Sequence, residues 1–409
     1  MVNAELVVIG DELLVGRVLD TNSSYLARRL HDLGCELDRI STVRDRPDAI
    51  KRAFAAALED HDVVIVSGGL GPTPDDLTKG VAAKFFGKRL ILDDAVLDRI
   101  EKYFATVGRK MPAASTRQAL VPNGAIVLEN PVGLAPGLIL VKDHKCLILL
   151  PGVPIELQKI FETGVVPFLE ETYYLTPLLV NVIRTFGVPE TEIMEKISGY
   201  FKRHKNVNVA YLPSPRGVDI RLWAEKDQKA LTECQNEITA RLKTNVYAFN
   251  NTKIEETVGE LLRKKGRTLC TAESCTGGIV AERLTDIPGS STYFKGGAVT
   301  YSNELKKSVL GVTDAALRRY GAVSPEVVSQ MAGGARERFA SDYALAISGI
   351  AGPGGGTEEK PVGLVYIGLA TPKKVETFER RFSGTRLMVR ERAAMTALDV
   401  LRRNLVDDH

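Results

Sequence analysis

Two neighbouring side chains that could act as nucleophiles, Ser274 and Cys275, lie in the run Thr271-Ala-Glu-Ser-Cys-Thr-Gly-Gly278. The run falls between a predicted strand and a predicted helix. Its glycines would let the backbone approach a ligand closely, and the start of the helix would offer free N–H groups to an anion or oxyanion. A glycine-rich turn with an N-cap serine is the plain alternative. The run by itself leaves both interpretations open.

The lack of histidine in this part of the chain limits which residue could act as the base for such a nucleophile. No histidine occurs in residues 206–408, and His409 is the last residue. A Ser–His–Asp or Cys–His arrangement therefore cannot be drawn from this part of the chain, and a neutral lysine is the usual substitute. Lys306 is the first candidate, with Lys307 and Lys295 as rivals and a solvated helix lysine as the alternative. The S-x-x-K pattern of β-lactamases is absent, because the third residue after the serine is glycine.

Two further motifs of the C-terminal part could hold a charged group. Ser348-Gly-Ile-Ala-Gly-Pro-Gly-Gly-Gly356 follows a predicted apolar strand, and a glycine-rich loop in that place suits phosphate or a closely packed ligand. It is neither a G-x-G-x-x-G loop followed by a helix nor a Walker A loop. Phe382-Ser-Gly-Thr-Arg386 places an arginine at the start of the final predicted helix, where it could bind a phosphate or a carboxylate. A capping turn with a surface arginine is the alternative.

The N-terminal part carries a second dense motif, Ser67-Gly-Gly-Leu-Gly-Pro-Thr-Pro-Asp-Asp-Leu-Thr78, between a predicted buried strand and a helix. The glycines permit close backbone approach, and the helix start favours an anion such as phosphate. Asp75 and Asp76 beside that anion would need a divalent cation. Asp11 and Glu12 add oxygen ligands at the same sheet edge if their strands are neighbours, and oxygen ligands favour Mg²⁺. Two aspartates that stabilise a helix dipole are the alternative.

Alternating strands and helices must position the N-terminal motif. Residues 1 to about 165 contain short apolar runs typical of buried parallel strands, and segments with helical spacing of apolar residues. The predicted strands are residues 5–10, 62–67 and 145–150, and the predicted helices are residues 22–33, 47–58 and 77–86. This rhythm indicates βαβ units and a mainly parallel sheet in an α/β domain.

Residues from about 170 to 250 have a different pattern. Their predicted strands and helices follow the order β-α-β-β-α over residues 178–187, 191–203, 207–212, 218–224 and 227–242. This small α+β module resembles a KH-like fold, but it has no G-x-x-G loop, so RNA binding does not follow. A spacer or dimerisation role is the prediction. Asn250-Asn-Thr252 is predicted to be a domain boundary. A helix over residues 254–265 is predicted to begin a third, glycine-rich α/β domain.

Length and composition fit a globular chain of several domains. At about 150 residues per domain, 409 residues predict two or three domains. The chain is 44% hydrophobic and 26% charged, which excludes global disorder, and its net charge of +3 is small for a nucleic-acid footprint. No apolar run reaches about 18 residues, and the N-terminus lacks the charged opening of a signal peptide. Five cysteines without a C-x-x-C pair indicate reduced thiols. We therefore expect a cytoplasmic protein without membrane or direct nucleic-acid partners.

Six C-terminal motifs, taken in order, resemble the CinA C-terminal domain, the nicotinamide mononucleotide deamidase family. They are Thr271–Gly278, Thr300–Lys306, Gly321–Ser324, Ile347–Pro353, Glu359–Gly363 and Phe382–Arg386. The resemblance implies the nicotinamide-nucleotide amidase reaction, in which the carboxamide is hydrolysed to nicotinate mononucleotide and ammonia without a cofactor. It implies that Ser274 is the nucleophile and Lys306 its base, that Tyr301 assists, and that Arg386 holds charge on the substrate. The residues predicted to contact the substrate are Glu273, Thr276, Gly277, Ser348 and Gly349.

Four N-terminal motifs resemble the MoaB-like, molybdopterin-binding domain of the CinA family. They are Val8–Gly16, Asp20–Ser23, Gly68–Thr78 and Leu150–Pro154. In that family this domain carries a metal-dependent ADP-ribose pyrophosphatase activity that yields AMP and ribose 5-phosphate. The resemblance then predicts substrate contacts by Gly68, Gly69 and Thr73, and a Mg²⁺ or similar ion held by Asp76, with Asp75, Asp11 and Glu156 as helpers. Because fold does not fix substrate, a molybdopterin-handling protein stays open.

The chain as a whole is identified as a member of the CinA family. The predicted domains are residues 1–168, the MoaB-like pyrophosphatase domain; residues 169–250, the KH-like module; and residues 251–409, the deamidase domain. The resemblance also suggests a homodimer that acts in recycling of pyridine nucleotides. A non-enzymatic competence or damage-response adaptor is a further interpretation, although the net charge of +3 gives no support to direct DNA binding.

Overall fold

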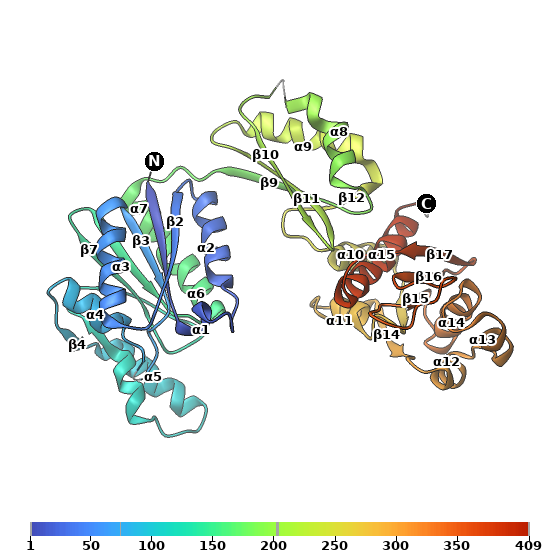
Figure 1. The fold of residues 1–409 in the computed structure, drawn as a ribbon, viewed down its shortest axis with the longest axis horizontal. Helices are drawn as coiled ribbons and strands as arrows, with labels where there is room; N and C mark the ends of the chain where they lie inside the picture. Colours follow the sequence, from blue (N-terminus) through green and yellow to red (C-terminus); the bar gives the residue numbers. More distant parts are fainter. Residues whose placement is uncertain (1, 74, 202–203, 408–409) are drawn as a thin grey trace. The chain divides into compact units, whose positions relative to one another are not determined.

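The chain forms two compact units, Met1–Leu179 and Val180–His409, and each is described by itself. The structure is a computed structural model, and it describes residues 2–73, 75–201 and 204–407. Figure 1 shows three groups of strands and helices along the chain: a MoaB-like α/β domain, a KH-like α+β module and a C-terminal α/β domain. The predicted fold class and the order of the three parts are confirmed.

A six-stranded sheet forms the centre of the first unit, in the order β2-β1-β3-β8-β7-β6. The strands are β1 (Asn3–Ile9), β2 (Glu36–Val43), β3 (Val63–Ser67), β6 (Ile126–Leu128), β7 (Gly137–Lys142) and β8 (Lys145–Leu150). The four strands from β2 to β8 are parallel, and β7 and β6 are antiparallel additions at one edge. Because β1 and β3 are parallel neighbours, the two predicted acidic motifs follow the carboxyl ends of adjacent strands.

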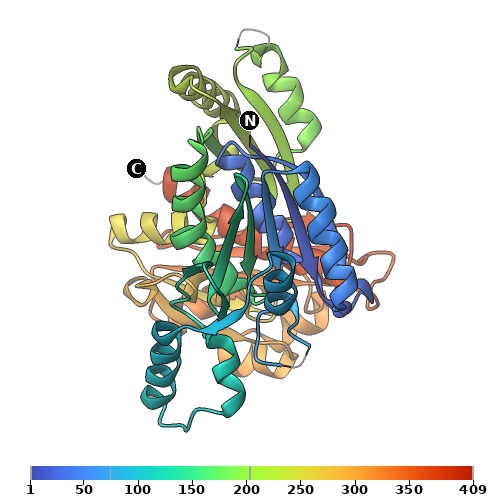
Figure 2. The same ribbon diagram turned by 90° about the vertical axis from the view of Figure 1, so that its left-hand side faces the viewer.

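Helices cover both faces of this sheet, which makes three layers. The main helices are α2 (Thr21–Asp32), α3 (Pro47–Asp60), α4 (Thr78–Phe85), α6 (Pro154–Ile160) and α7 (Val166–Tyr173). One face packs Leu6 and Ile65 against α2, α6 and α7, and the other packs Val7 and Val64 against α3 and α4 (Figure 2). Both faces of each central strand are therefore buried, which explains their continuous apolar sequences.

The remaining elements of the first unit lie around these layers. They are α1 (Asp11–Leu14), α5 (Asp94–Thr106), the short antiparallel pair β4 (Leu90–Leu92) and β5 (Leu120–Pro122), a 3₁₀ helix (Ala113–Ala119) and a π-helical turn (Phe161–Val165). The sequence did not predict β2, because this edge strand leaves most of its residues exposed or half-buried and so lacks an apolar run.

The second unit begins with the KH-like module, a four-stranded sheet in the order β10-β11-β9-β12. Its elements are β9 (Leu179–Thr185), α8 (Glu190–Phe201), β10 (Asn208–Ser214), β11 (Gly217–Ala224), α9 (Gln228–Leu242), a 3₁₀ turn (Lys243–Asn245) and β12 (Val246–Phe249). The predicted β-α-β-β-α order is present, with β12 as an added strand. Residues 202 and 203, at the predicted end of the first helix, lie outside the described residues.

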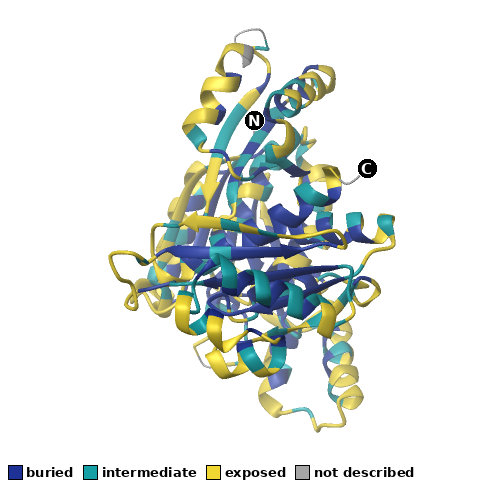
Figure 3. Ribbon diagram, turned by 90° about the vertical axis from the view of Figure 1, so that its right-hand side faces the viewer, coloured by how far each residue is buried: buried dark blue, intermediate teal, exposed yellow. Residues whose placement is uncertain are grey.

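The C-terminal domain has a five-stranded sheet in the order β14-β13-β15-β16-β17. The strands are β13 (Leu269–Glu273), β14 (Phe294–Val299), β15 (Tyr343–Gly349), β16 (Leu364–Ala370) and β17 (Val375–Arg381). β14, β13 and β15 are parallel, β16 is antiparallel to β15, and β17 is antiparallel to β16. The central strands are buried, whereas the edge strand β17 is mostly exposed (Figure 3).

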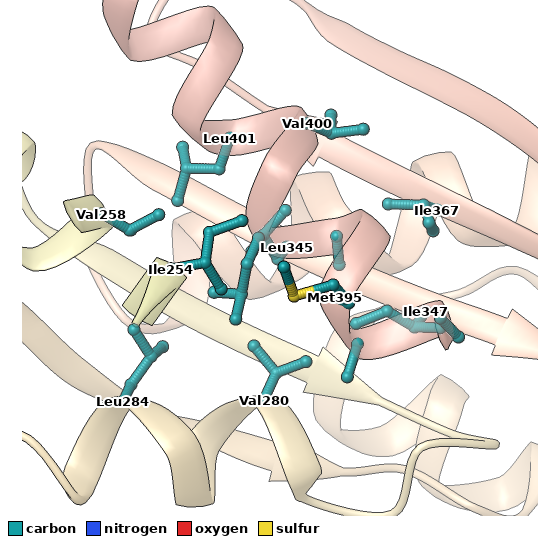
Figure 4. Close-up of a cluster of buried hydrophobic side chains, with 14 of the residues drawn as sticks. Ile254, Val258, Val280, Leu284, Leu345, Ile347, Ile367, Met395, Val400 and Leu401 are labelled. Carbon is teal, nitrogen blue, oxygen red and sulfur yellow. The ribbon is translucent and has the colours of Figure 1, made fainter. Parts of the chain in front are cut away.

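Helices also cover both faces of this sheet. They are α10 (Ile254–Lys265), α11 (Ile279–Thr285), α12 (Asn303–Leu310), α13 (Asp314–Tyr320), α14 (Pro325–Arg338) and α15 (Arg386–Asp407), with a 3₁₀ turn (Ser290–Thr292) before β14. Figure 4 shows one layer, where Ile254, Val280 and Met395 from three helices meet Leu345 and Ile347 of β15. The helices α12, α13 and α14 cover the other face.

The KH-like module and the C-terminal domain share part of one hydrophobic core. Tyr247 and Ala248 of β12 belong to the same buried cluster as the helices of Figure 4. Arg402 and Arg403 of α15 donate hydrogen bonds to the backbone carbonyl and the hydroxyl of Thr244 in the KH-like module. The domain boundary predicted near residue 250 therefore lies inside one compact unit.

Two simple features complete the fold. Within the described residues, no helix combines the length and the apolar character that crossing a membrane requires. All five cysteines are unpaired and buried, as the sequence predicted for reduced thiols.

Candidate functional site

The fold brings Ser274 and Lys306 together from different elements. Ser274 follows directly after β13, and Lys306 lies on α12, which follows the neighbouring strand β14. The Lys306 Nζ atom is 3.2 Å from the Ser274 Oγ atom in hydrogen-bond geometry. Only 1% of Lys306 and 8% of Ser274 is exposed. The predicted nucleophile and base thus form a buried pair, and the alternative of a solvated helix lysine does not hold for Lys306.

The remaining contacts of Lys306 suit an uncharged amine. Its Nζ donates to the backbone carbonyls of Thr300, at 2.9 Å, and Tyr301, at 3.3 Å. Two carbonyls can take the two N–H groups of a neutral amine and leave the nitrogen lone pair for the serine hydroxyl. Burial lowers the pKa of Lys306, and only the nearby Cys275 and Glu304 act in the opposite direction. Burial alone, and not a neighbouring cation such as Arg386, is the cause.

The rival residues lack the burial and the serine contact that Lys306 has. Lys307 forms an exposed ion pair with Asp314, with 3.0 Å between Nζ and Oδ1, and Lys295 is exposed on β14. Cys275, the neighbour of the serine, is buried, and burial raises the pKa of its thiol to about 12. Because the thiolate is the nucleophilic form of cysteine, this burial disfavours Cys275 as a nucleophile at neutral pH.

A tight turn presents the serine. The backbone N–H of Ser274 donates to the carbonyl of Ile347 on β15, and the N–H of Gly277 donates back to the carbonyl of Ser274. Gly277 has a φ of +64°, a left-handed conformation that favours glycine. The nucleophile is therefore fixed at the end of β13 by its own turn and by the neighbouring strand.

Glu273 occupies the helix start that was expected to receive an anion from the substrate. Its carboxylate accepts hydrogen bonds from the backbone N–H groups of Gly278, Val280 and Ala281, and the side chain is only 1% exposed. The expectation of free N–H groups at the start of α11 is therefore wrong for these three. A buried carboxylate at a helix N-terminus stabilises the turn that carries Ser274.

Tyr301 and Arg386, both predicted for the site, contact each other. Arg386 begins α15, and its guanidinium donates to the Tyr301 hydroxyl at 3.0 Å and to the Gly352 carbonyl at 2.7 Å. Tyr301 is 61% exposed. Tyr301 therefore contacts Lys306 through its backbone carbonyl and Arg386 through its side-chain hydroxyl.

The other predicted substrate contacts are largely engaged within the protein. Ser348 is buried, and its hydroxyl donates to the Ala322 carbonyl at 2.7 Å. Gly349 packs against the backbone of β16, where a side chain would collide with Leu364 and Val365. Thr276 is fully buried, and its carbonyl accepts a hydrogen bond at 2.7 Å from Arg390, a residue that the sequence reading missed.

The N-terminal motifs meet at a cleft of about 690 Å³ beside the carboxyl ends of β1, β3 and β8. Its lining includes the predicted Gly68, Gly69, Asp75, Asp76 and Glu156. Glu12, Asp20 and Asp45 raise the number of carboxylates to six, and no Lys, Arg or His stands among the described residues that line the cleft. An anionic ligand in this cleft would therefore have to bring its own cation.

The predicted metal ligands are dispersed around this cleft. Asp76 accepts from the backbone N–H and the hydroxyl of Thr73, and Glu156 accepts from the Asn130 amide. Asp11 does not line the cleft. Among the residues that the structure describes, no three His, Cys, Asp or Glu side chains are close enough to hold an ion. The set Asp11, Asp75, Asp76 and Glu156 is thus not a preassembled metal centre.

Asp45 is the acidic residue that sequence reasoning missed. Burial raises its pKa, and the negative charges of Glu12, Asp11 and Asp75 raise it further. Its carboxylate accepts from the backbone N–H of Asp11 at 3.0 Å. Asp45 stands two residues after β2, so recognition of that strand as the parallel neighbour of β1 would have placed it at this edge.

Three family models match consecutive parts of the chain. A "Probable molybdopterin binding domain" matches residues 5–171, the "Damage-inducible protein CinA KH domain" matches residues 181–248, and the "CinA C-terminal domain" matches residues 251–405. A competence-damage inducible protein of Caldicellulosiruptor saccharolyticus is 44% identical over 409 residues, with 99% of each chain covered. This chain belongs to the CinA family. A CinA-like protein of Kosmotoga olearia is 42% identical over 408 residues and covers 98% of this chain and 99% of its own length.

A solved structure matches a smaller part of the chain. The competence/damage inducible protein CihA from Agrobacterium tumefaciens is 40% identical, covers 38% of this chain and 98% of its own, and has a TM-score of 0.36. Within this CinA-family chain, Ser274, Lys306, Tyr301 and Arg386 all fall in the part matched by the CinA C-terminal model, and the acidic cleft falls in the part matched by the molybdopterin-binding model.

Proposed function

We propose that the C-terminal domain hydrolyses the carboxamide of nicotinamide mononucleotide to nicotinate mononucleotide and ammonia. The observation that carries the proposal is the buried pair of Lys306 and Ser274, with 3.2 Å between the amine and the hydroxyl. Burial lowers the pKa of Lys306, so this lysine can accept a proton at a lower pH than an exposed one. A serine beside an amine with a lowered pKa is an arrangement that can carry out acyl transfer without histidine.

In the proposed first step, Lys306 Nζ takes the proton of the Ser274 hydroxyl while Oγ attacks the carboxamide carbon. The bond from that carbon to nitrogen then breaks, and the leaving amine takes the proton from Lys306 and departs as ammonia. A water molecule gives a proton to Lys306 and attacks the ester, and Ser274 Oγ recovers the proton as it leaves. The carbonyls of Thr300 and Tyr301 keep the amine aimed at the serine throughout.

Arg386 and Tyr301 are proposed to contact the nucleotide outside this pair. Arg386 is exposed, its contacts are one carbonyl and one hydroxyl, and no carboxylate pairs with it among the described residues. An exposed guanidinium without an acidic partner suits a phosphate group. Tyr301 contacts Lys306 through its carbonyl and Arg386 through its hydroxyl, so we assign it the role of ordering the substrate relative to both groups. The deamidase site needs no metal or cofactor in this proposal.

Ammonia release from nicotinamide mononucleotide by the purified full-length chain tests this proposal. Ser274→Ala and Lys306→Ala should each abolish release, while Lys307→Ala should leave it unchanged, because Lys307 points to Asp314. The proposal fails if the parent protein releases no ammonia, or if Lys306→Ala and Lys307→Ala behave alike.

We propose a second activity for the N-terminal cleft, the hydrolysis of ADP-ribose to AMP and ribose 5-phosphate. The observation that favours it is the cleft itself, where glycine backbone and six carboxylates meet and the described lining contains no basic side chain. Mg²⁺ is commonly bound by one or two carboxylates together with substrate phosphates, so a preassembled centre is not required. Asp75 and Asp76 are the residues proposed to hold a divalent ion, which would neutralise the diphosphate when bound.

Two alternative functions would each give a distinct experimental result. A molybdopterin-handling protein would retain pterin on purification, and the open cleft is large enough for it. An adaptor without catalysis would keep its cellular phenotype in Ser274→Ala. A homodimer and a cytoplasmic location are further proposals, and light scattering and cell fractionation would test them.

A further inference from the structure

The geometry points to Arg390 as the positioning residue that fixes the turn carrying Ser274. This inference rests on the proposed amide hydrolysis and assigns to it a residue outside the motifs that the sequence singled out. Arg390 lies on α15, one helical turn after Arg386, and its Nη2 donates to the Thr276 carbonyl at 2.7 Å. The residue does not touch Ser274 or Lys306 directly and acts through the backbone.

The contact fixes one peptide plane at both ends. The Thr276 carbonyl and the Gly277 N–H belong to the same planar peptide group. Arg390 holds the carbonyl, and the Ser274 carbonyl accepts from the N–H at 3.1 Å, closing the four-residue turn. Rotation of this peptide would break both hydrogen bonds together. The orientation of the turn, and with it the direction of the Ser274 hydroxyl, is therefore set from α15.

The surroundings of the guanidinium agree with a functional placement. A side-chain carbon added at Gly277 would lie 3.2 Å from Arg390 Nη2, so the turn and the guanidinium are closely packed. Among the described residues, no carboxylate forms an ion pair with Arg390, and its Nε is buried without a partner. Leaving a buried N–H donor of a charged side chain without a partner is unfavourable for folding alone.

Neighbouring contacts hold α15 in place behind the turn. Glu391, the next residue, pairs with Arg283 of α11 and with Arg216 of the KH-like hairpin. α11 starts at the end of the same turn, where Glu273 caps it. Arg390 is thus carried by an element that is anchored on both sides, as precise positioning requires.

The test compares Arg390→Met, which keeps the length of the stem and removes the donor, with Arg336→Met. Arg336 is a matched control, because it makes one guanidinium-to-carbonyl contact, with Thr371, from α14 on the other face of the sheet. Three quantities are measured on the full chain: kcat and KM for ammonia release, the rate at which a small fluorophosphonate labels Ser274, and the midpoint of thermal unfolding. The labelling reagent carries no nucleotide, so it reports the serine alone.

We expect Arg390→Met to lower kcat and the labelling rate by about 100-fold, with KM within about 3-fold of the parent, because small misplacements of reacting groups have effects of that size. Arg336→Met should change neither rate. Labelling at the parent rate in a folded Arg390→Met protein overturns the inference, and so does a raised KM with unchanged kcat, which would mean substrate binding instead. If Arg390→Met does not fold, Arg390→Lys decides: labelling slowed by about 10-fold supports the inference and the parent rate overturns it.

Failure of the proposed reaction would be visible separately. If the parent protein releases no ammonia from nicotinamide mononucleotide yet is labelled far faster than Arg390→Met, the positioning role stands and only the substrate assignment falls.

Discussion

The N-terminal cleft gathers six carboxylates in an open space of about 690 Å³, whereas the C-terminal site buries one lysine against one serine. In the cleft, the negative charges of the carboxylates are not balanced by basic side chains of the described lining. A cation that enters with the ligand has to neutralise them. At the serine, burial lowers the lysine pKa, so the site favours the uncharged amine before any ligand arrives. The activity of the cleft should therefore depend on a metal ion, and the activity of the Ser274 site should not.

The largest expected effect is the loss of the buried pair. Ser274→Ala and Lys306→Ala should each lower the deamidase rate by roughly 1,000-fold or more, and the double variant should lose little beyond either single change, because the two residues act as a unit. The ADP-ribose activity should be unchanged in all three. Coupled colorimetric assays of ammonia and of phosphate-containing products, on the same preparations, measure both. Additive losses in the double variant would mean that the two residues act independently.

The metal prediction concerns the cleft. Asp76→Asn removes charge but keeps an acceptor for Thr73, so the turn should survive while ADP-ribose hydrolysis falls by about 100-fold. Asp48→Asn, at the exposed start of α3, is the matched control and should have no effect. A chelator should stop ADP-ribose hydrolysis and spare ammonia release. Equal loss of both activities on chelation would contradict the contrast between the two sites.

A truncation tests where the deamidase unit begins. Residues 250–409 contain every group of the Ser274 site, so this fragment should retain activity. It lacks Tyr247 and Ala248 of the shared core and Thr244, whose carbonyl accepts from Arg402, so its melting temperature should fall by at least about 5 °C relative to residues 180–409. Calorimetry of both fragments measures the difference. Equal melting temperatures would show that the KH-like module adds nothing to the stability of the site.

The smallest effect is expected at the neighbouring thiol. Cys275→Ala should keep ammonia release within about 3-fold of the parent, because burial raises the pKa of this thiol to about 12 and leaves no thiolate at neutral pH. Steady-state rates of Cys275→Ala and Ser274→Ala, measured side by side, check this. Activity that survives in Ser274→Ala and vanishes in Cys275→Ala would reverse the assignment of the nucleophile.

The sequence predicted elements well where burial leaves a clear pattern. The helix over residues 254–265 and the strand over residues 145–150 have the predicted bounds, because apolar spacing and flanking turns mark both. The edge strand β2 was missed because an exposed strand needs no apolar run. Asp45 was missed for the same reason. Its position beside Asp11 depends on the pairing of β2 with β1, and residues distant in sequence determine that pairing.

The sequence also predicted some residues of the site and missed others. The absence of histidine from this part of the sequence favoured a lysine base, and the fold places Lys306 beside Ser274, 32 positions earlier in the sequence. The sequence could not show that Glu273 caps α11, because its partners are backbone groups of the helix start. Arg390 could have been suspected from its spacing of four residues after Arg386, which puts both on one face of α15.

The most direct test of the central claim is the deamidase rate of Lys306→Arg between pH 7 and pH 9. In the parent, the pKa of Lys306 is lowered by burial, so the neutral fraction and the rate should rise with pH and fall on the acid side as the amine becomes protonated. Arginine keeps its proton throughout this range and cannot act as the base. The account predicts a rate for Lys306→Arg as low as that of Lys306→Ala at every pH. A rate within a few-fold of the parent would contradict it.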